Sequence, residues 1–234
     1  MYSNDLNYFC DQKENILFAD DTCLIYCDSD LLRLTHHVNE RLQLILDWCN
    51  YNKLSINPSK SEYMVFTNRI VDSNPVIKLG NDIISRKSAV KYLGLNIDDG
   101  LKFNTHIDYL KAKLSRLSGV SYRLRNHFNR ATALKFYYAC VYSLLTYCMP
   151  VYGGALTSHR GDVLAKTHER IVKNLFQPTS HNRCPLKMNR LLKLNDIHKL
   201  YAGVHMYRVI VEGGNSVVAD TISLQTATHP YDTW

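Results

Sequence analysis

The stretch NILFADDTCLIY, residues 15–26, constrains the fold more than any other part of the chain. It places two adjacent carboxylates, Asp20 and Asp21, between two short runs of residues that favour β-strands. This pattern predicts a hairpin whose turn covers residues 19–22. Neighbouring carboxylates beside apolar strands repel each other and lose hydration, so they need open solvent or a compensating cation. The pair is therefore either a solvated hairpin tip or part of a metal site.

The rest of the first hundred residues alternates one helix with short strands. Residues 31–49 carry apolar side chains at spacings of three and four, which predicts an amphipathic helix capped by Ser29 or Asp30 and ending before Pro58. This region is expected to form an antiparallel sheet with one helix. Further strands are predicted at residues 61–67, 75–79, 83–85 and 89–98, with a turn at residues 80–82.

Beyond residue 100 the apolar spacing becomes helical. The second of the predicted helices is apolar on nearly every side, so we expect it to be central and to be interrupted by Pro150, Gly153 and Gly154. The chain is therefore predicted to be α+β, with domains at residues 1–100 and 101–212 and a loose tail at 213–234. The four helices are predicted at residues 104–128, 130–149, 159–176 and 186–211.

Charge is divided unevenly along the chain. Residues 1–100 carry 10 Lys and Arg against 14 Asp and Glu, a balance of −4. Residues 101–200 carry 17 against 4, a balance of +13. The second half is suited to meet a polyanion such as a nucleic acid, although a solvated basic surface has the same composition.

The cysteines and the apolar runs bear on the cellular compartment. The seven cysteines form no Cys-x-x-Cys pair and no matched Cys/His spacing, which argues against a zinc module or a disulfide scaffold. Reduced thiols of this kind are typical of proteins inside the cell. The sequence has no apolar run of membrane-spanning length and no signal-peptide pattern at its start. We therefore expect an intracellular protein, nuclear or cytoplasmic, without a membrane span.

Four segments occur in an order that carries a resemblance. They are FADDT at residues 18–22, LDWCNYNKLSINPSKSEYMVF at 46–66, KYLGLNIDDGLKFNTHI at 91–107, and a downstream pattern that includes YYACVYSLLTYCMPVYGGA and KLNDIHKLY. In this order they resemble reverse transcriptases of non-LTR retrotransposons. The first is similar to the aromatic-x-Asp-Asp hairpin of that family's palm, the second to the helix-to-strand passage after it, and the third to the hairpin that contacts the primer end. The resemblance implies a partial polymerase palm followed by a helical, thumb-like region.

The resemblance also implies roles for single residues. Asp20 is implied as a metal ligand and Asp21 as its partner in a catalytic site that uses two Mg²⁺ ions. Lys60 stands where the family has a lysine near the leaving pyrophosphate, and Ser61 stands where the family usually has Thr. A solvated surface lysine after a proline turn is the other reading of Lys60.

Tyr92, Leu93 and Gly94 match the primer-contacting hairpin, where glycine permits a close approach of the backbone. Ordinary sheet packing is compatible with Tyr92 and Leu93 as well. The partners that the resemblance implies are an RNA template, a DNA primer and deoxynucleoside triphosphates.

A further metal-binding aspartate and the fingers are expected to lie upstream of Met1, because MYSNDL resembles the stretch just after the family's second motif. Asp5 and Asp11 are not expected to substitute, since neither lies in a strand-like run beside the hairpin. One carboxylate pair cannot hold two ions as the reaction requires, so the isolated chain is expected to be inactive. The hairpin is also expected to present an unpaired sheet edge that invites association.

A non-catalytic nucleic-acid-binding module is the alternative function. The aromatic side chains of the helix at 130–149, namely Phe136, Tyr137, Tyr138, Tyr142 and Tyr147, are expected in the helix core rather than as platforms for bases. In the alternative, basic helices grip a duplex or hybrid through phosphate contacts. The cations predicted to make these contacts are Lys111, Lys113, Arg116, Arg123 and Arg125.

Overall fold

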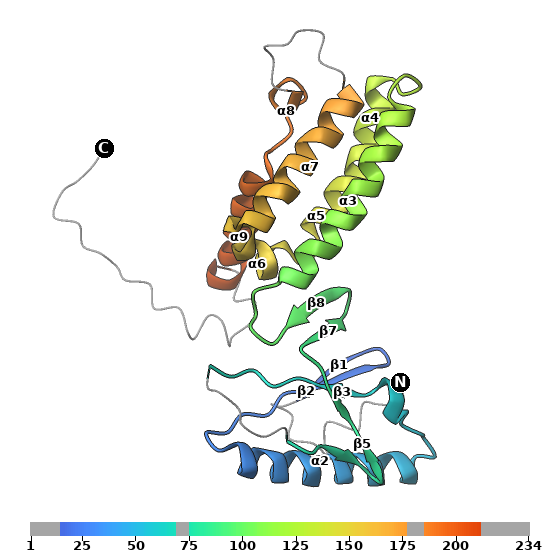
Figure 1. Ribbon diagram of the computed structural model, residues 1–234, viewed down its shortest axis with the longest axis vertical. Coiled ribbons are helices and arrows are strands. Elements are labelled where there is room, and N and C mark those ends of the chain that lie inside the picture. The colour runs from blue at the N-terminus through green and yellow to red at the C-terminus, as the bar shows by residue number, and fades with distance from the viewer. Residues whose placement is uncertain (1–14, 69–74, 177–184, 212–234) are drawn as a thin grey trace, which may run out of the picture. The chain divides into compact units, whose positions relative to one another are not determined.

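The computed structural model describes residues 15–68, 75–176 and 185–211 (Figure 1). The chain divides into two compact units, Met1–Leu101 and Lys102–Trp234. The first unit holds short strands and one long helix, and the second is helical, which confirms the predicted α+β class. The expectations for Asp5, Asp11 and residues 213–234 concern parts of the chain outside those described.

The predicted hairpin forms at the start of the described chain. Strand β1 (Asn15–Phe18) pairs antiparallel with strand β2 (Asp21–Leu24), and Phe18 faces Asp21 at the end of the ladder. The turn consists of Ala19 and Asp20 alone, and is therefore shorter than predicted because Asp21 already belongs to β2. Ala19 has a φ of 54° at the first turn position, as in a type II′ turn.

The two faces of this hairpin have different surroundings, because side chains alternate along a strand. Leu17 and Leu24 pack against the buried core of the first unit. Ile16 and Phe18 lie on the opposite face, and Phe18 is 60% exposed. The β1–β2 ladder has no third strand among the described residues, so both of its edges are unpaired there.

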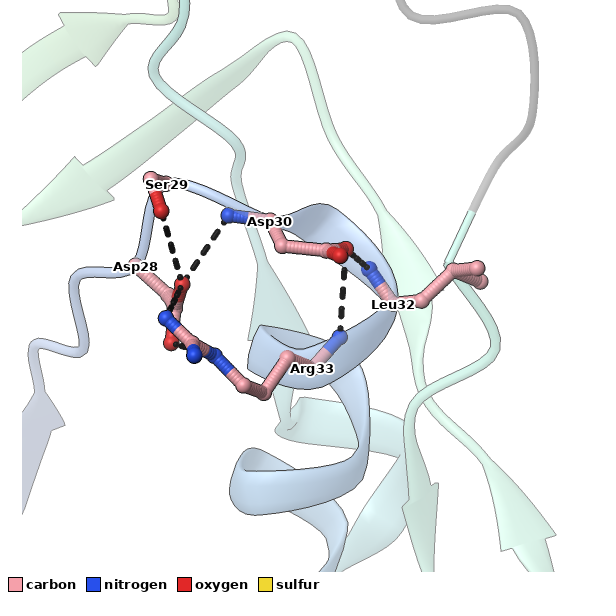
Figure 2. A network of polar contacts seen from close by, with 5 residues as sticks. All are labelled: Asp28, Ser29, Asp30, Leu32 and Arg33. Atoms are coloured by element: carbon pink, nitrogen blue, oxygen red, sulfur yellow. Dashed lines mark hydrogen bonds and ion pairs between the residues drawn. The ribbon is translucent and has the colours of Figure 1, made fainter.

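Helix α2 (Leu31–Tyr51) begins at a network of carboxylates (Figure 2). Of the two predicted caps, Asp30 is the N-cap: its carboxylate accepts hydrogen bonds from the backbone N–H groups of Leu32 and Arg33 at 2.8 and 3.4 Å. Asp28 accepts two hydrogen bonds from the Arg33 guanidinium at 2.8 and 2.7 Å. This pairing, with the backbone N–H of Asp30, holds the pKa of Asp28 well below its usual range.

The strands after α2 are short and pair two by two. Strands β4 (Lys78–Leu79) and β5 (Asp82–Ile83) form a hairpin in which Gly80 has a φ of 63°. Strand β3 (Glu62–Tyr63) pairs in parallel with β6 (Ser85–Arg86), whereas the other pairs are antiparallel. The strands predicted at 61–67 and 75–79 are thus only two residues long.

Residues 89–98 form a third hairpin, as the resemblance implies, rather than the single strand predicted from their composition. Strand β7 (Ala89–Tyr92) pairs antiparallel with β8 (Leu95–Asp98), and the loop is Leu93 and Gly94. Both loop residues have positive φ, 45° and 84°, the combination of a type I′ turn. Glycine suits this turn, whereas a leucine there is strained.

One core joins α2 to the strands of the first unit. Asn39 fixes α2 to the start of β4, because its amide donates to the Val76 carbonyl at 3.0 Å and accepts from the Lys78 N–H at 2.8 Å. The buried side chains that form this core are Leu42, Ile45, Trp48, Cys49, Ile77, Leu79 and Ile84.

The second unit is built from long helices that alternate with short ones. The helix predicted at 130–149 forms as α4 (Arg130–Phe136), a π-helical segment η2 (Tyr137–Tyr142) and α5 (Ser143–Thr146). It therefore ends at Thr146, before Pro150. Cys148, with a φ of 53°, turns the chain there, and Pro150 fits the first turn of the next helix. The helix predicted at 186–211 is two helices separated by residues 189–193. The elements are α3 (Asn104–Leu124), α4 (Arg130–Phe136), η2 (Tyr137–Tyr142), α5 (Ser143–Thr146), α6 (Met149–Tyr152), η3 (Gly153–Thr157), α7 (His159–Phe176), α8 (Pro185–Met188) and α9 (Leu194–Val211).

Helices α3 and α7 lie side by side and run in the same direction (Figure 1). Arg160, near the start of α7, forms an ion pair with Asp108, near the start of α3. Further along, Arg170 donates to the Ser118 hydroxyl at 3.0 Å, and Asn174 donates to the Ser118 carbonyl at 3.2 Å. The residue numbers of the partners rise together, which establishes the parallel direction. Among the core side chains between the helices of this unit are Ile107, Leu110, Leu114, Val141, Leu145, Leu164 and Ile171.

No single helix in the described ranges has the length and apolar character to cross a membrane. The residues Arg130–Thr146 and Met149–Thr157 meet that criterion together, but they bend by 52° where they join. Val141, Leu145 and Met149 of this pair are fully buried within the second unit.

Five cysteines fall within the described residues, and none of them forms a disulfide there. They are Cys23, Cys27, Cys49, Cys140 and Cys148.

Candidate active-site hairpin and nucleic-acid surface

Asp20 and Asp21 lie at the tip of the β1–β2 hairpin. Asp20 is the second residue of the turn and Asp21 is the first residue of β2, so the backbone places two neighbouring carboxylates at one end of a short ladder. Both residues are exposed, and within the described residues neither carboxylate has a hydrogen-bond or ion-pair partner. Their oxygens are therefore available to an ion or a ligand from solution.

These carboxylates supply part of a ligand set for a hard divalent cation. Carboxylate oxygens are the ligands that Mg²⁺ prefers, and Mg²⁺ commonly keeps waters and substrate phosphates in its other positions. Across residues 15–68, 75–176 and 185–211, no three His, Cys, Asp or Glu side chains come together to hold a metal ion. The donor chemistry of Asp20 and Asp21 thus fits one side of a metal site.

Tyr92 approaches the carboxylate hairpin from β7. Burial raises the pKa of the Tyr92 hydroxyl, and the neighbouring Cys23 and Asp21 raise it further. The same hydroxyl is shielded from solvent and has no hydrogen-bond partner among the described residues. The structure therefore brings the hairpin at Leu93 and Gly94 into the neighbourhood of the Asp20–Asp21 tip, within the first unit.

Lys60 ends a short 3₁₀ turn, η1 (Pro58–Lys60), that leads into β3. The Asn57 side chain caps this turn by accepting from the Ser59 N–H at 3.0 Å, and the Ser61 hydroxyl donates to the Asn57 carbonyl at 3.1 Å. The Lys60 side chain is exposed, and none of the ion pairs formed by the described residues joins it to Asp20 or Asp21.

The five predicted nucleic-acid-binding cations all belong to α3 or its end. Lys111, Lys113, Arg116 and Arg123 are exposed, and Arg125 is half-buried. Two of them sit over tyrosine rings: the Lys113 ammonium is 5.5 Å from the Tyr109 ring centre, and the Arg125 guanidinium is 4.1 Å from that of Tyr122. The opposite side of α3 packs on α7. This packing holds the helix in place while its cations face solvent.

The expectation that the aromatic residues of the central helix all lie in the core is wrong for two of them. Tyr137 is fully buried and Phe136 and Tyr142 are half-buried, but Tyr138 and Tyr147 are exposed. A helix has one buried side, so a run of apolar residues at consecutive positions must place some of them outward. The sequence could have shown this, because the adjacent residues Tyr137 and Tyr138 cannot both face the core.

Curated proteins of mobile elements are similar to this chain. The RNA-directed DNA polymerase from mobile element jockey of Drosophila melanogaster is 30% identical over 169 residues, which is 68% of this chain and 18% of that protein. Its counterpart in Drosophila funebris is 27% identical over 192 residues, 79% of this chain and 21% of that protein. The probable RNA-directed DNA polymerase from transposon BS of Drosophila melanogaster is 28% identical over 163 residues, 65% of this chain and 17% of that protein.

No protein-family model matches the chain, and no solved structure does. The chain spans about a fifth of the length of the curated relatives named above. It is therefore a homologue of part of the RNA-directed DNA polymerases of non-LTR retrotransposons.

Proposed function

We propose that this chain contributes part of the palm, residues 1–100, and a thumb-like region, residues 101–212, to an RNA-directed DNA polymerase. The observation that carries the proposal is the exposed carboxylate pair Asp20 and Asp21 on a short hairpin, with Tyr92 of a second hairpin beside it. In this proposal the enzyme uses an RNA template, a DNA primer and deoxynucleoside triphosphates, as reverse transcription requires.

Asp20 and Asp21 would hold Mg²⁺ on one side, and the remaining ligands would come from another part of a polymerase and from the nucleotide phosphates. Divalent ions in such a site supply charge that stabilises the attacking and leaving oxygens of phosphoryl transfer. Lys60, free at the end of η1, is assigned to the charge that develops on the leaving pyrophosphate. In this role the Lys60 side chain would have to point toward the phosphates.

The turn formed by Leu93 and Gly94, together with Tyr92, is assigned to the primer end. Its positive φ angles make it tight, and Gly94 leaves room for a sugar-phosphate backbone. A primer end held at Tyr92 would stay close to the metal ligands, which is the positioning that in-line transfer needs.

We expect the isolated chain to be inactive, because two carboxylates do not complete a two-metal site. The test is primer extension on an RNA template with Mg²⁺, comparing the 234-residue chain with its Asp20→Asn, Asp21→Asn variant. Equal background extension by both chains supports the proposal. Metal-dependent extension by the unmodified chain alone would show that the predicted inactivity is wrong. Association through the unpaired edges of β1 and β2 is part of the same proposal, and sedimentation of the chain measures it.

A non-catalytic nucleic-acid-binding function is the second candidate, and the exposed cations of α3 favour it. Binding of a labelled RNA–DNA hybrid should weaken steeply as salt rises. Charge reversal at Lys111, Lys113 and Arg116 should reduce the slope of log affinity against log salt by about one for each lost phosphate contact. Lys78→Glu in the first unit is the matched control and should leave that slope unchanged. A flat salt dependence of the unmodified chain contradicts this function.

An intracellular site of action, in the nucleus or in the cytoplasm, belongs to the proposal as well. The five cysteines of the described residues support it, because they form no disulfide there and reducing compartments preserve thiols.

A further inference from the structure

Three tyrosines from two helices form an aromatic cluster that reaches the surface of the second unit. Tyr138 and Tyr142 of η2 meet edge to face with ring centres 5.3 Å apart, and Tyr142 lies 6.3 Å from Tyr201 of α9. Tyr138 is 49% exposed, whereas Tyr142 and Tyr201 are half-buried. Exposure therefore decreases across the cluster: the Tyr138 ring is outermost, and the rings of Tyr142 and Tyr201 are more buried.

The rings of Tyr138 and Tyr142 pack on the buried Tyr137. Tyr137, the neighbour of Tyr138, is fully buried, and its hydroxyl lies 2.9 Å from Nε2 of His168 in α7. Burial and a side-chain hydrogen bond with Tyr201 raise the pKa of Tyr142 to about 12. A rigid ring gains stacking energy at little cost in conformational entropy, so a fixed cluster of this kind is suited to binding planar groups.

A strip of exposed apolar side chains on α9 continues beyond Tyr201. Its members repeat at spacings of four, three and four, which places them along one side of the helix. Tyr207 is 57% exposed, although it carries a large ring. The strip consists of Leu200, Val204, Tyr207 and Val211.

The stretches of sequence that form most of this surface lack acidic residues. Residues 109–161, which include all of η2, contain no Asp or Glu, and neither do residues 197–211 of α9. Lys135 lies one turn before Tyr138, and Arg208 lies one turn after Val204, and both side chains are exposed. Asp196 lies one turn before Leu200 at the start of α9, and Glu212 directly follows Val211 in the sequence, so acidic residues flank only the two ends of the strip. Aromatic rings next to Lys135 and Arg208 are complementary to a polyanion that carries planar groups.

We propose that the surface formed by Tyr138, Tyr142, Tyr201 and the α9 strip binds single-stranded nucleic acid by stacking its bases on the tyrosine rings. Lys135 and Arg208 would neutralise the flanking phosphates. Bases paired in a duplex have their faces covered by their neighbours, so this surface selects unpaired strands. Its residues differ from the cations of α3, and the proposal does not depend on the carboxylate hairpin or on the proposed polymerase chemistry.

The test uses the full 234-residue chain and a fluorescein-labelled, unstructured RNA of about 16 nucleotides, a length within the range that one single-strand-binding domain covers. Fluorescence anisotropy measures its affinity over a series of salt concentrations, with a blunt duplex of equal length as the second probe. Tyr138→Ala should weaken single-strand binding about tenfold at every salt concentration, because one stacking contact is lost and no charge is removed. Lys135→Ala should instead lower the salt slope.

Three variants separate stacking from other causes. Tyr138→Phe keeps the ring and should bind like the unmodified chain, whereas Tyr138→Leu keeps apolar area without a ring and should bind like Tyr138→Ala. Tyr51→Ala removes a tyrosine that is 85% exposed in the first unit and should change nothing. Circular dichroism checks that each variant keeps its helix content.

The proposal is overturned if Tyr138→Ala leaves single-strand affinity unchanged, or if it weakens duplex binding equally. It is also overturned if Tyr138→Ala changes only the sedimentation mass of the chain, since the surface would then join two copies. Because no measurement here depends on polymerisation, failure of the proposed catalytic function leaves this result unaffected.

Discussion

The hydroxyl of Tyr137 and Nε2 of His168 lie 2.9 Å apart, and both side chains are fully buried. This contact joins the π-helical segment η2 to α7. Nδ1 of His168 has no hydrogen-bond partner among the described residues. Burial lowers the pKa of His168 to about 4, so the imidazole is neutral in the folded chain at neutral pH.

We predict that the second unit loses stability in acid because of His168. The unfolded chain binds a proton at this residue near pH 6.5, whereas the folded chain does not until about pH 4, so stability is complete above pH 6.5 and falls as the pH is lowered toward 4. At pH 4.5 the loss from this residue is on the order of 2–3 kcal/mol. Burial lowers the pKa of His106 as well, which adds in the same direction.

Urea unfolding at pH 7.5 and pH 4.5 measures this effect. The His168→Gln variant cannot gain the proton, so its free energy of unfolding should fall less between these pH values than that of the unmodified chain. His36→Gln, at an exposed histidine of α2, is the matched control and should behave as the unmodified chain does. An equal decline in the His168→Gln variant would contradict the prediction.

Two adjacent glycines should respond differently to alanine. A Cβ at Gly153 would lie 2.1 Å from Cδ2 of His198 in α9, whereas a Cβ at Gly154 would meet nothing within 4 Å. We predict that Gly153→Ala lowers the free energy of unfolding by about 1–3 kcal/mol, because the His198 ring must move. Gly154→Ala should be neutral or slightly stabilising. Thermal unfolding of the two variants checks this, and equal melting temperatures would show that the ring moves freely.

The carboxylate hairpin should bind a divalent ion weakly even in the isolated chain. We predict that Mn²⁺ broadens the amide resonances of residues 18–22 and of Tyr92 in an ¹⁵N-labelled sample, because the carboxylates of Asp20 and Asp21 are free. Replacing both with Asn should abolish the broadening. Replacing Asp98 and Asp99, the other adjacent carboxylate pair of the first unit, should not. Broadening that survives the loss of Asp20 and Asp21 contradicts their assignment as metal ligands.

The sequence predicted the elements whose pattern is local. The hairpin at Asp20 and Asp21 and the helices at residues 31–51, 104–124 and 159–176 formed because strand propensity and apolar spacing act within a few residues. The lengths of strands β3 and β4 were overestimated. Their ends are set by pairing with β6 and β5 and not by their own composition. The end of the helix was predicted at Pro150, whereas the chain already turns at Cys148. Cysteine is not a typical turn residue, so the sequence does not indicate that Cys148 adopts a left-handed backbone conformation.

The candidate site was predictable only in part. The resemblance supplied Asp20, Asp21 and Tyr92. The structure adds that the charge of Asp21 raises the pKa of the Tyr92 hydroxyl, a relationship between residues 71 positions apart that no local pattern encodes. The aromatic surface at Tyr138 was missed, because an apolar helix predicts burial but not which of its sides is covered.

The most direct measurement of the central claim is primer extension by a chimera. Residues 15–99 of this chain would replace the matching segment of the jockey RNA-directed DNA polymerase, which retains its own upstream part. We predict extension on an RNA template that is lost when Asp20 and Asp21 become Asn and kept when Asp82, an exposed residue of β5, becomes Asn. Extension that persists without Asp20 and Asp21 would contradict the claim that this hairpin carries metal ligands of a polymerase active site.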